Sequence, residues 1–223
     1  MLYVKKFLSA ALLAAMIFLP STNTFAARSE ISFLDAGAGS DNLSVMTALM
    51  QRQTERNFVD KDLTTVQLAK ILCAANGNNR TNGKRVNPAA LGVYSVEVYA
   101  VTSEGIYLYD PANHQLKLIA EGDFRSITTT GQSFVTKAAL NLVYVETPDA
   151  WKNAKHTPPP RERQIAFANI YVGAMVQSVA LAAQTEGLGN CVRGSINRDE
   201  FKKVAKLSAD KNILLAQSIG FTK

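Results

Sequence analysis

The side chains that most often catalyse reactions or bind metals are scarce in this chain. Its 223 residues include two histidines and two cysteines, without Cys-x-x-Cys or His-x-x-x-His spacing, which excludes most metal sites. A serine triad would have to recruit His114 or His156, and no Gly-x-Ser-x-Gly elbow is present. We therefore expect no catalytic side chain, and a bound cofactor that carries the chemistry instead.

One short segment could hold a phosphate group. Arg52, Gln53, Thr54 and Arg56 lie close together, and an arginine gives an oxyanion two charge-assisted hydrogen bonds while a threonine hydroxyl donates another. A solvated basic turn before a helix would contain the same residues. The formal charge of +6 suits an anionic small ligand. The lysines and arginines are scattered, with no run that alternates with aromatics, so a nucleic-acid partner is not expected.

Two further segments contain the small residues that let a flat ligand lie on the backbone. Pro88, Ala89 and Ala90 form one of them, and residues 187–194, with three glycines, form the other. Taken alone, the first is explained by an ordinary turn. A glycine that ends a helix explains Gly187 but not the rest of the second segment.

Helices and strands must position these segments. We predict a helix over residues 44–51 and another that begins at Asp62 or Thr64 and ends near Ala75. The first should direct three apolar side chains inward, namely Val45, Leu49 and Met46. Runs rich in β-branched and aromatic residues predict strands over 93–101, 105–110, 115–119, 140–145 and 213–220. The expected fold class is therefore α+β.

The longest predicted helix covers residues 161–186, between Pro158–Pro160 and Gly187. It is apolar on both faces, and a helix that is apolar all round is expected to be buried all round. A membrane span is the alternative, but three polar side chains interrupt it: Asn169, Gln177 and Ser178. We therefore expect a helix in a subunit interface and no stable membrane anchor, with Gly173 and Ala174 permitting close approach.

The first residues have the features of an export signal. Lys5 and Lys6 precede an apolar run that is too short to span a bilayer comfortably, and small residues allow cleavage after Ala26. We predict a signal peptide over 1–26, a loose lead-in over 27–43 and an exported, periplasmic or secreted protein. In an oxidising compartment Cys73 and Cys191 could pair, although two separate buried thiols are the simpler interpretation.

Four segments in this order resemble the FMN-dependent nitroreductase family, in its compact branch similar to azoline-oxidising dehydrogenases. They are Arg52–Phe58, Leu72–Arg80, Arg85–Ala90 and Glu186–Gly194, and residues 216–221 match the family's last core strand. The resemblance implies a nitroreductase-like FMN-binding domain over 44–223. Its central mixed or antiparallel sheet would be flanked by helices. The long helix would lie buried at a homodimer interface, with one FMN per subunit.

The resemblance also implies roles for individual residues. Arg52 would bind the FMN phosphate with Thr54, and Gln53, Arg56 and Arg85 would lie around the cofactor. Pro88, Ala89 and Ala90 would pack on the isoalloxazine, commonly from the partner subunit. Ala89 stands where the family often has serine, and Asn87 could compensate for that lost hydroxyl.

The remaining contacts concern the ribityl and ring atoms. Gln132 and Lys137 stand where the family places ribityl or pyrimidine contacts. Arg193 and Gly194 would act through backbone amides aimed at the flavin, one of them at N5, with the side chain of Arg193 mattering less than its N–H. Lys223, or Arg80 with Arg85, would replace the basic phosphate ligand that many relatives carry further on.

The resemblance implies a two-electron oxidoreductase. It would transfer hydride through flavin N5 to a nitroaromatic, quinone or similar small-molecule acceptor. NAD(P)H is the expected electron donor. Export leaves two alternatives open, because nicotinamide nucleotides are scarce outside the cytoplasm. One is a flavin-fold binding protein without turnover, and the other is a specialised FMN dehydrogenase acting on a peptide or small molecule.

Overall fold

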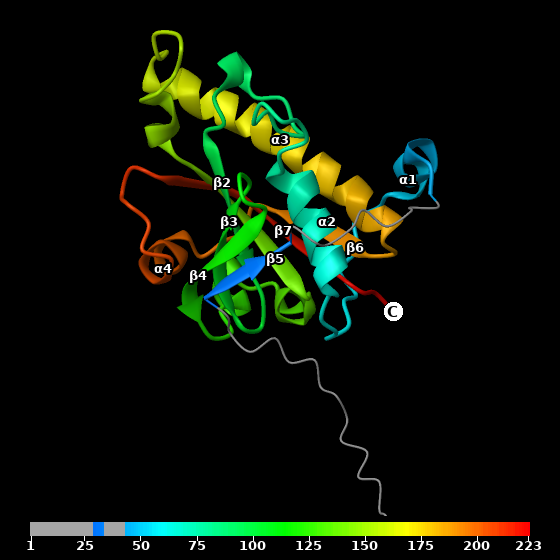
Figure 1. Ribbon diagram of the computed structural model, residues 1–223. Coiled ribbons are helices and arrows are strands. Elements are labelled where there is room, and N and C mark those ends of the chain that lie inside the picture. Colours follow the sequence, from blue (N-terminus) through cyan, green and yellow to red (C-terminus); the bar gives the residue numbers. More distant parts are fainter. Residues whose placement is uncertain (1–28, 34–42) are drawn as a thin grey trace, which may run out of the picture.

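The architecture is one antiparallel sheet of seven strands with helices on both faces (Figure 1). The computed structural model describes residues 29–33 and 43–223. The predicted signal peptide therefore lies outside the described residues, as does most of the predicted lead-in. The strand order is β1 (Glu30–Ser32), β4 (Gln115–Glu121), β3 (Gly105–Asp110), β2 (Val96–Val101), β5 (Leu140–Glu146), β7 (Asn212–Gly220) and β6 (Gly189–Arg193).

Every neighbouring pair of strands in this sheet is antiparallel, so the sheet is antiparallel rather than mixed. The α+β class and the sheet flanked by helices are confirmed. The strands predicted from β-branched and aromatic residues correspond to β2, β3, β4, β5 and β7. Three elements were not predicted. They are β1, which lies inside the expected lead-in, β6, and the short helix α4 (Arg198–Val204).

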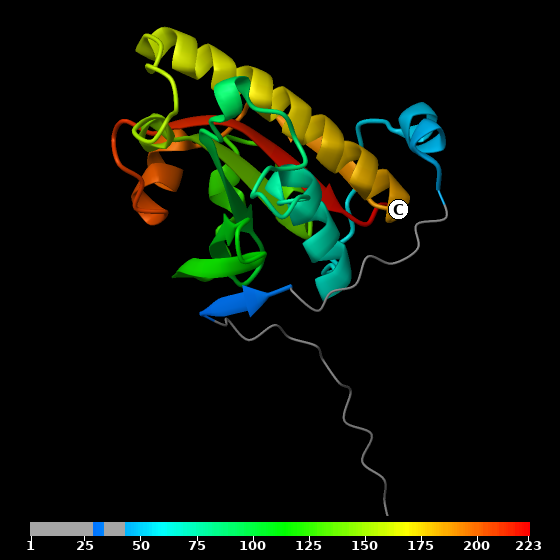
Figure 2. The same cartoon turned by 45° about the horizontal axis from the view of Figure 1, so that its top comes forward.

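Alternation along the strands divides the core into two layers. On one face, Val98 and Leu142 pack with α2 (Thr65–Asn76) and α3 (Arg161–Thr185). On the other face, Tyr99 and Val143 pack with Phe201 of α4. Figure 2 shows α2 and α3 together on one side of the sheet and α4 on the opposite side.

Helix α2 begins with a capping box. The Thr64 hydroxyl accepts from the Gln67 backbone N–H at 3.2 Å, and the Gln67 side chain accepts from the Thr64 N–H at 3.1 Å. This pair of bonds satisfies two of the backbone donors that a helix start leaves free. Of the two caps considered from the sequence, Thr64 is the one used.

Helix α3 is buried along one face only within a single chain, which differs from the all-round burial expected. Tyr171, Val172 and Met175 are buried, whereas Ile170 is 72% exposed and Gly173 is also exposed. In the described part of the chain, α3 is the one helix whose length and composition would allow it to cross a membrane. Its packing against α2 and the sheet is that of the core helix of a globular domain.

The inward orientation expected for α1 (Val45–Gln51) is wrong. Val45 and Met46 are 67% and 66% exposed, Leu49 is also exposed, and Ala48 is the one buried residue of this helix. Figure 1 shows why: α1 stands off from the sheet near the end of α3, so little of its surface meets the core. Local periodicity found the helix but could not indicate which surface it would meet.

Candidate functional site

A cavity of about 290 Å³ opens beside the segment that was expected to bind a phosphate. We call it the Arg56 cavity. Its walls are Arg56, Asn57, Phe58, Ser133, Phe134, Lys137 and Lys223. Three of these side chains are cationic and none is acidic. The cavity is therefore electropositive, and two aromatic rings, Phe58 and Phe134 with centroids 6.1 Å apart, supply its apolar surface.

Gln132 directly precedes two of the cavity residues and has an unsatisfied acceptor. Its backbone N–H donates to the Thr129 hydroxyl at 3.1 Å, but its side-chain Oε1 is buried without a hydrogen-bond partner among the described residues. A buried carbonyl oxygen left unpaired costs free energy. A ligand N–H that reached this oxygen would remove that cost.

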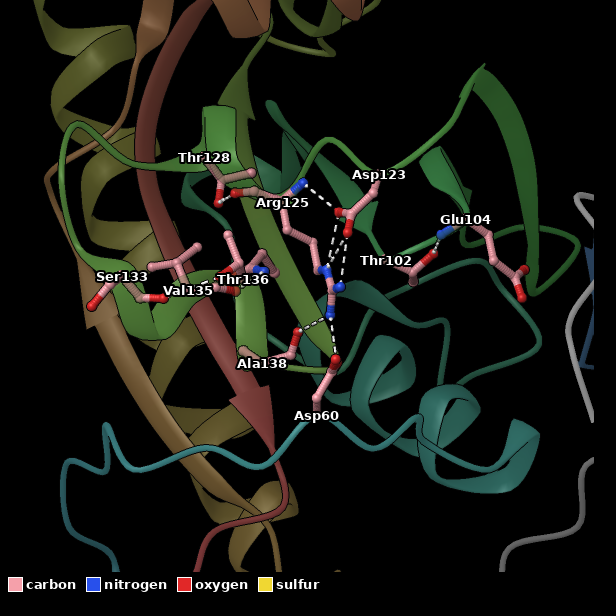
Figure 3. A network of polar contacts seen from close by, with 11 residues as sticks. Asp60, Thr102, Glu104, Asp123, Arg125, Thr128, Ser133, Val135, Thr136 and Ala138 are labelled. Carbon is pink, nitrogen blue, oxygen red and sulfur yellow. Dashed lines mark hydrogen bonds and ion pairs between the residues drawn. The ribbon is translucent and has the colours of Figure 1, made fainter.

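Arg125 fixes the two walls of the Arg56 cavity relative to each other (Figure 3). It is only 6% exposed, and its guanidinium donates to both Asp123 oxygens, to Asp60 Oδ1 at 3.3 Å and to the Ala138 carbonyl at 3.3 Å. Asp60 follows the wall at 56–58, and Ala138 follows the wall at 133–137. The hydrogen bonds and charge of Asp123, followed by those of Asp60, raise the pKa of Arg125.

The segment expected to be a glycine loop after α3 is an edge strand, β6. Asn190 forms a parallel bridge with Thr54, and the Asn190 carbonyl accepts from the Glu55 N–H at 2.9 Å. The structure thus brings two of the predicted segments, 52–56 and 187–194, side by side. A Cβ at Gly189 would lie 2.8 Å from Glu55 Cβ, so this close approach requires glycine.

The strand geometry changes which backbone amides can meet a ligand. Successive residues of a strand direct their N–H groups to opposite edges. Because Asn190 faces the Thr54 side, Val192 and the position of Gly194 share that side, whereas Arg193 faces β7 across the Arg193–Ala216 pair. The backbone N–H of Arg193 therefore faces β7, and the contact of this amide with a flavin stays a prediction.

The side chain of Arg193 has a structural role that the sequence analysis discounted. It is 3% exposed, and its hydrogen-bond partners among residues 29–33 and 43–223 are all neutral: Ser218 Oγ, the Thr128 carbonyl and Oγ1, the Ser195 carbonyl and Asn141 Oδ1. Burial lowers the pKa of Arg193 to about 10, so it remains charged at neutral pH. Ser195 in turn bonds Thr130, which leads into the loop carrying Gln132.

The other predicted residues of the first segment lie outside the lining of the Arg56 cavity. Arg52 is the half-buried C-cap of α1, with its N–H bonded to the Ala48 carbonyl. The Gln53 side chain is engaged with Glu55, its Nε2 donating to Oε1 at 2.5 Å. Thr54 is exposed beside β6. Arg52 and Thr54 remain available to a ligand that extends beyond the cavity.

A second cavity, of about 300 Å³, contains the other predicted segment. We call it the Arg85 cavity, and it is lined by Arg80, Lys84, Arg85, Pro88, Ala89 and neighbouring residues. Ala90 begins the short helix η1 (Ala90–Gly92) directly after it. The two cavities share no lining residue.

Asn87 cannot replace the missing serine hydroxyl, because its side chain is already occupied. Its Nδ2 donates to the carbonyls of Ala74 and Ala75 at 2.8 and 2.9 Å, and its Oδ1 accepts from the Ser178 hydroxyl at 2.6 Å. Buried between α2 and α3, Asn87 joins the two helices and holds the Pro88 turn in place.

Cys73 and Cys191 are both free thiols, so the simpler interpretation of the sequence holds for pairing. Cys191 is buried, whereas Cys73 is only half-buried. Burial raises the pKa of both thiols. At Cys191 the nearby Arg56 and Arg193 guanidinium groups act in the opposite direction, which places two positive charges around the middle of β6.

Sequence reasoning missed several site residues. Arg125 carried no local signal, since its partners Asp60 and Ala138 are distant in sequence. Phe58, Ser133 and Phe134 likewise become cavity walls only through tertiary packing. Lys137 and Lys223, which the resemblance placed near the cofactor, do lie in one cavity with Arg56.

A model of the nitroreductase family matches residues 49–221, which is most of the chain. The chain belongs to the nitroreductase family. A relative from Methanocaldococcus jannaschii, provisionally named a nitroreductase, is 25% identical over 176 residues, covering 75% of this chain and 86% of that protein. A solved structure from Ralstonia eutropha JMP134, likewise assigned as a nitroreductase, is 31% identical with a TM-score of 0.79, covering 88% of this chain and 90% of that chain.

A more distant structure shares the fold. The NADPH:FMN oxidoreductase from Vibrio harveyi, solved with NAD⁺, is 17% identical with a TM-score of 0.58, covering 80% of this chain and 69% of that chain. The family and the nitroreductase-like fold expected from the sequence are therefore confirmed. This nitroreductase is an oxidoreductase of the general type that its family defines.

The neutral environment of Arg193 leads to a stability prediction. Arg193→Met leaves the buried Thr128 and Ser195 carbonyls without this donor, and each unpaired buried group costs about 1–3 kcal/mol. Relief from burying the charge offsets part of this cost, so we expect unfolding free energy to fall by about 2–4 kcal/mol. Urea denaturation measures the change.

The matched control for that variant is Arg198→Met. Among the described residues Arg198 likewise donates to neutral acceptors, the carbonyls of Ile213, Gly194 and Leu214, but it is exposed. Its loss should cost less than about 1 kcal/mol, because water replaces it. Equal effects of the two substitutions would show that burial of Arg193 has no special importance.

Proposed function

We propose that this nitroreductase is an FMN-dependent oxidoreductase that uses NAD(P)H to reduce a nitroaromatic, quinone or similar small molecule. The observation that carries the proposal is the electropositive Arg56 cavity, one of whose walls begins at Ser133, directly after Gln132 with its unpaired side-chain oxygen. When bound, FMN would supply two-electron hydride exchange at its N5 atom. The chain's own residues would bind and orient the cofactor, with no side chain acting as a nucleophile.

The residues present fit the pyrimidine end of a flavin. An imide N–H is the kind of donor that Gln132 Oε1 lacks, and Arg56, Lys137 and Lys223 can stabilise negative charge on the neighbouring ring oxygens. Fixed cations in a partly desolvated cavity favour a more negative ligand. Arg125 would keep both walls in register while the ligand binds.

Arg52 and Thr54 would bind the phosphate end. Both precede the cavity along the same segment, and Thr54 is held against β6 by the bridge to Asn190. An arginine at a helix end can present two parallel donors to a phosphate. The relatives support this assignment of cofactor, since the Vibrio harveyi neighbour is named for FMN and NADPH.

We further propose that two copies of the chain complete each site. The Arg56 and Arg85 cavities are separate, and each lies at the lower end of the roughly 300–1,000 Å³ typical of ligand pockets. Apolar surface that could meet a second copy is present on α1, at Val45 and Met46, and on α3, at Ile170. Pro88 and Ala89 of one subunit would then close the cofactor site of its partner.

Export is a separate proposal, supported by Lys5, Lys6, the apolar run that follows and the small residues before Ala27. The electron donor of an exported flavoenzyme would have to be present in the compartment to which the enzyme is delivered. The measurement that checks export is the intact mass of protein recovered from the cell envelope, which should correspond to a chain that begins at Ala27. Full-length protein in the cytoplasm would contradict it.

Cofactor binding is tested by titrating flavin-free protein with FMN and with riboflavin, which lacks the phosphate. Arg52→Glu should weaken FMN binding about 10- to 100-fold, from a lost charge-assisted bond worth about 1.5–3 kcal/mol plus repulsion, and leave riboflavin unchanged. Gln132→Leu should weaken both ligands about equally, by roughly 3- to 10-fold, because it alters a ring contact.

The control for the charge reversal is Lys203→Glu, on the exposed surface of α4 across the sheet. It makes the same change in net charge and should leave both affinities unchanged. A parent protein that binds neither flavin would refute the proposed cofactor. If Arg52→Glu bound FMN normally, residues 52–56 would be no more than a solvated basic turn.

Dimer formation is tested with Gly173→Arg. No atom lies within 4 Å of a Cβ added at Gly173, so a single chain has room for the new side chain. In a close-packed interface the same charge would be buried at a cost of several kcal/mol. Light scattering should show a dimer for the parent and for Gly173→Ala, but a monomer for Gly173→Arg. A monomeric parent would refute the shared site.

A further inference from the structure

The Arg85 cavity gathers positive charge that the protein itself does not neutralise. Arg80, Lys84 and Arg85 line it together, and no acidic residue does. Among the described residues none of the three forms an ion pair. Three cations around one cavity repel each other, and a bound anion relieves that repulsion.

The guanidinium of Arg85 is held in place by uncharged groups. It lies over the Tyr94 ring, 4.5 Å from the centroid, and the Arg85 backbone N–H donates to the Tyr94 hydroxyl at 3.1 Å. It also lies close to Tyr171: burial raises the pKa of Tyr171 to about 12, and the charge of Arg85 acts to lower it. The Tyr171 hydroxyl donates to Asn76 Oδ1. Stacking on Tyr94 leaves the N–H donors of the Arg85 guanidinium for a ligand.

The backbone around the cavity is also held in a defined shape. Asn78 bridges to Arg85, and the Gly83 N–H donates to the Arg80 carbonyl at 3.1 Å, so the three cations sit on one closed turn. On the other side, Leu91 adopts φ 56° and Gly92 φ 69°. A leucine in the left-handed region is strained, and such strain is often found where a loop is shaped for a ligand.

We propose that the Arg85 cavity binds the oxyanion, a carboxylate or phosphate, of a small molecule with which the oxidoreductase reacts. The inference rests on the proposed function and adds to it a substrate class. Anionic molecules should bind better than neutral ones of the same shape, because a pre-positioned guanidinium recognises an oxyanion through two parallel bonds.

The test compares ligands of the same shape that differ in charge. Calorimetry on FMN-saturated protein measures the affinities of para-nitrobenzoate, para-nitrobenzamide and inorganic pyrophosphate. We expect the parent to prefer para-nitrobenzoate to the amide by at least about 10-fold, and Arg85→Gln to abolish the preference. Arg80→Gln with Lys84→Gln, two exposed positions, should reduce it without disturbing the packing of Arg85.

Arg163→Gln is the matched control, since Arg163 also lies over a ring, that of Phe167, at 5.8 Å, but outside the cavity. It should keep the preference. Para-nitrobenzoate binding alone would identify an acceptor carboxylate, whereas pyrophosphate binding that competes with NADPH would identify a donor phosphate.

Three results would overturn the inference. The first is equal affinity of the parent for para-nitrobenzoate and para-nitrobenzamide, and the second is an undiminished preference for para-nitrobenzoate in Arg85→Gln. The third is weaker binding of FMN but not of riboflavin in Arg85→Gln, which would assign the cavity to the flavin phosphate. A parent that binds no FMN would overturn the proposed function instead. Pyrophosphate binding that Arg85→Gln abolishes would still support the anion site in that case.

Discussion

The buried guanidinium of Arg193 is the interaction on which the functional side of this domain depends. It joins β6 to β5 through Asn141, to β7 through Ser218 and to the turn at Thr128. No carboxylate of the described residues pairs with it, so its charge is spread over carbonyl, hydroxyl and amide oxygens whose own positions it fixes in return. This polar cluster therefore holds the edge strand beside the Thr54 segment, together with the apolar packing of Cys191 against Phe58 and Ala138.

Hydrogen bonds connect this cluster to both walls of the Arg56 cavity. Ser195 connects it to Thr130 and so to the loop of Gln132. The carbonyl of Arg125 accepts a hydrogen bond from the Thr128 hydroxyl, and the Arg125 guanidinium connects Asp60 with Ala138. Two buried arginines, one paired with acids and one bonded to neutral groups, thus position a cavity whose own cations form no ion pair with any described residue.

Much of the fold could be predicted from local sequence. Dense runs of β-branched and aromatic residues predicted β2, β3, β5 and β7, and residues typical of helix ends predicted the bounds of α2 and α3. These elements could be predicted because the pattern of buried residues that stabilises them is visible along the chain. β6 was missed because Gly187 and Gly194 on either side of it are typical of a loop, and because its strand form depends on pairing with β7. The orientation of α1 failed because no local pattern tells a helix which surface it will meet.

The site was predictable as a set of segments but not as a set of contacts. The resemblance to the nitroreductase family grouped residues 52–56 with 187–194, and the bridge from Thr54 to Asn190 joins them. The sequence did not predict the buried bonds of the Arg193 side chain or those that occupy the Asn87 side chain, because their partners come from β5, β7, α2 and α3.

The position of β7 has a consequence for how the chain acquires this fold. β7 is the last strand along the sequence, yet it lies inside the sheet, between β5 and β6. Until residues 212–220 have been synthesised, β5 lacks one neighbour and β6 has none within the sheet. Pairing of strands so distant in sequence is slow, and open strand edges attract other chains. Completion of the sheet therefore waits for β7, and until β7 is inserted the free edges of β5 and β6 can attract other chains.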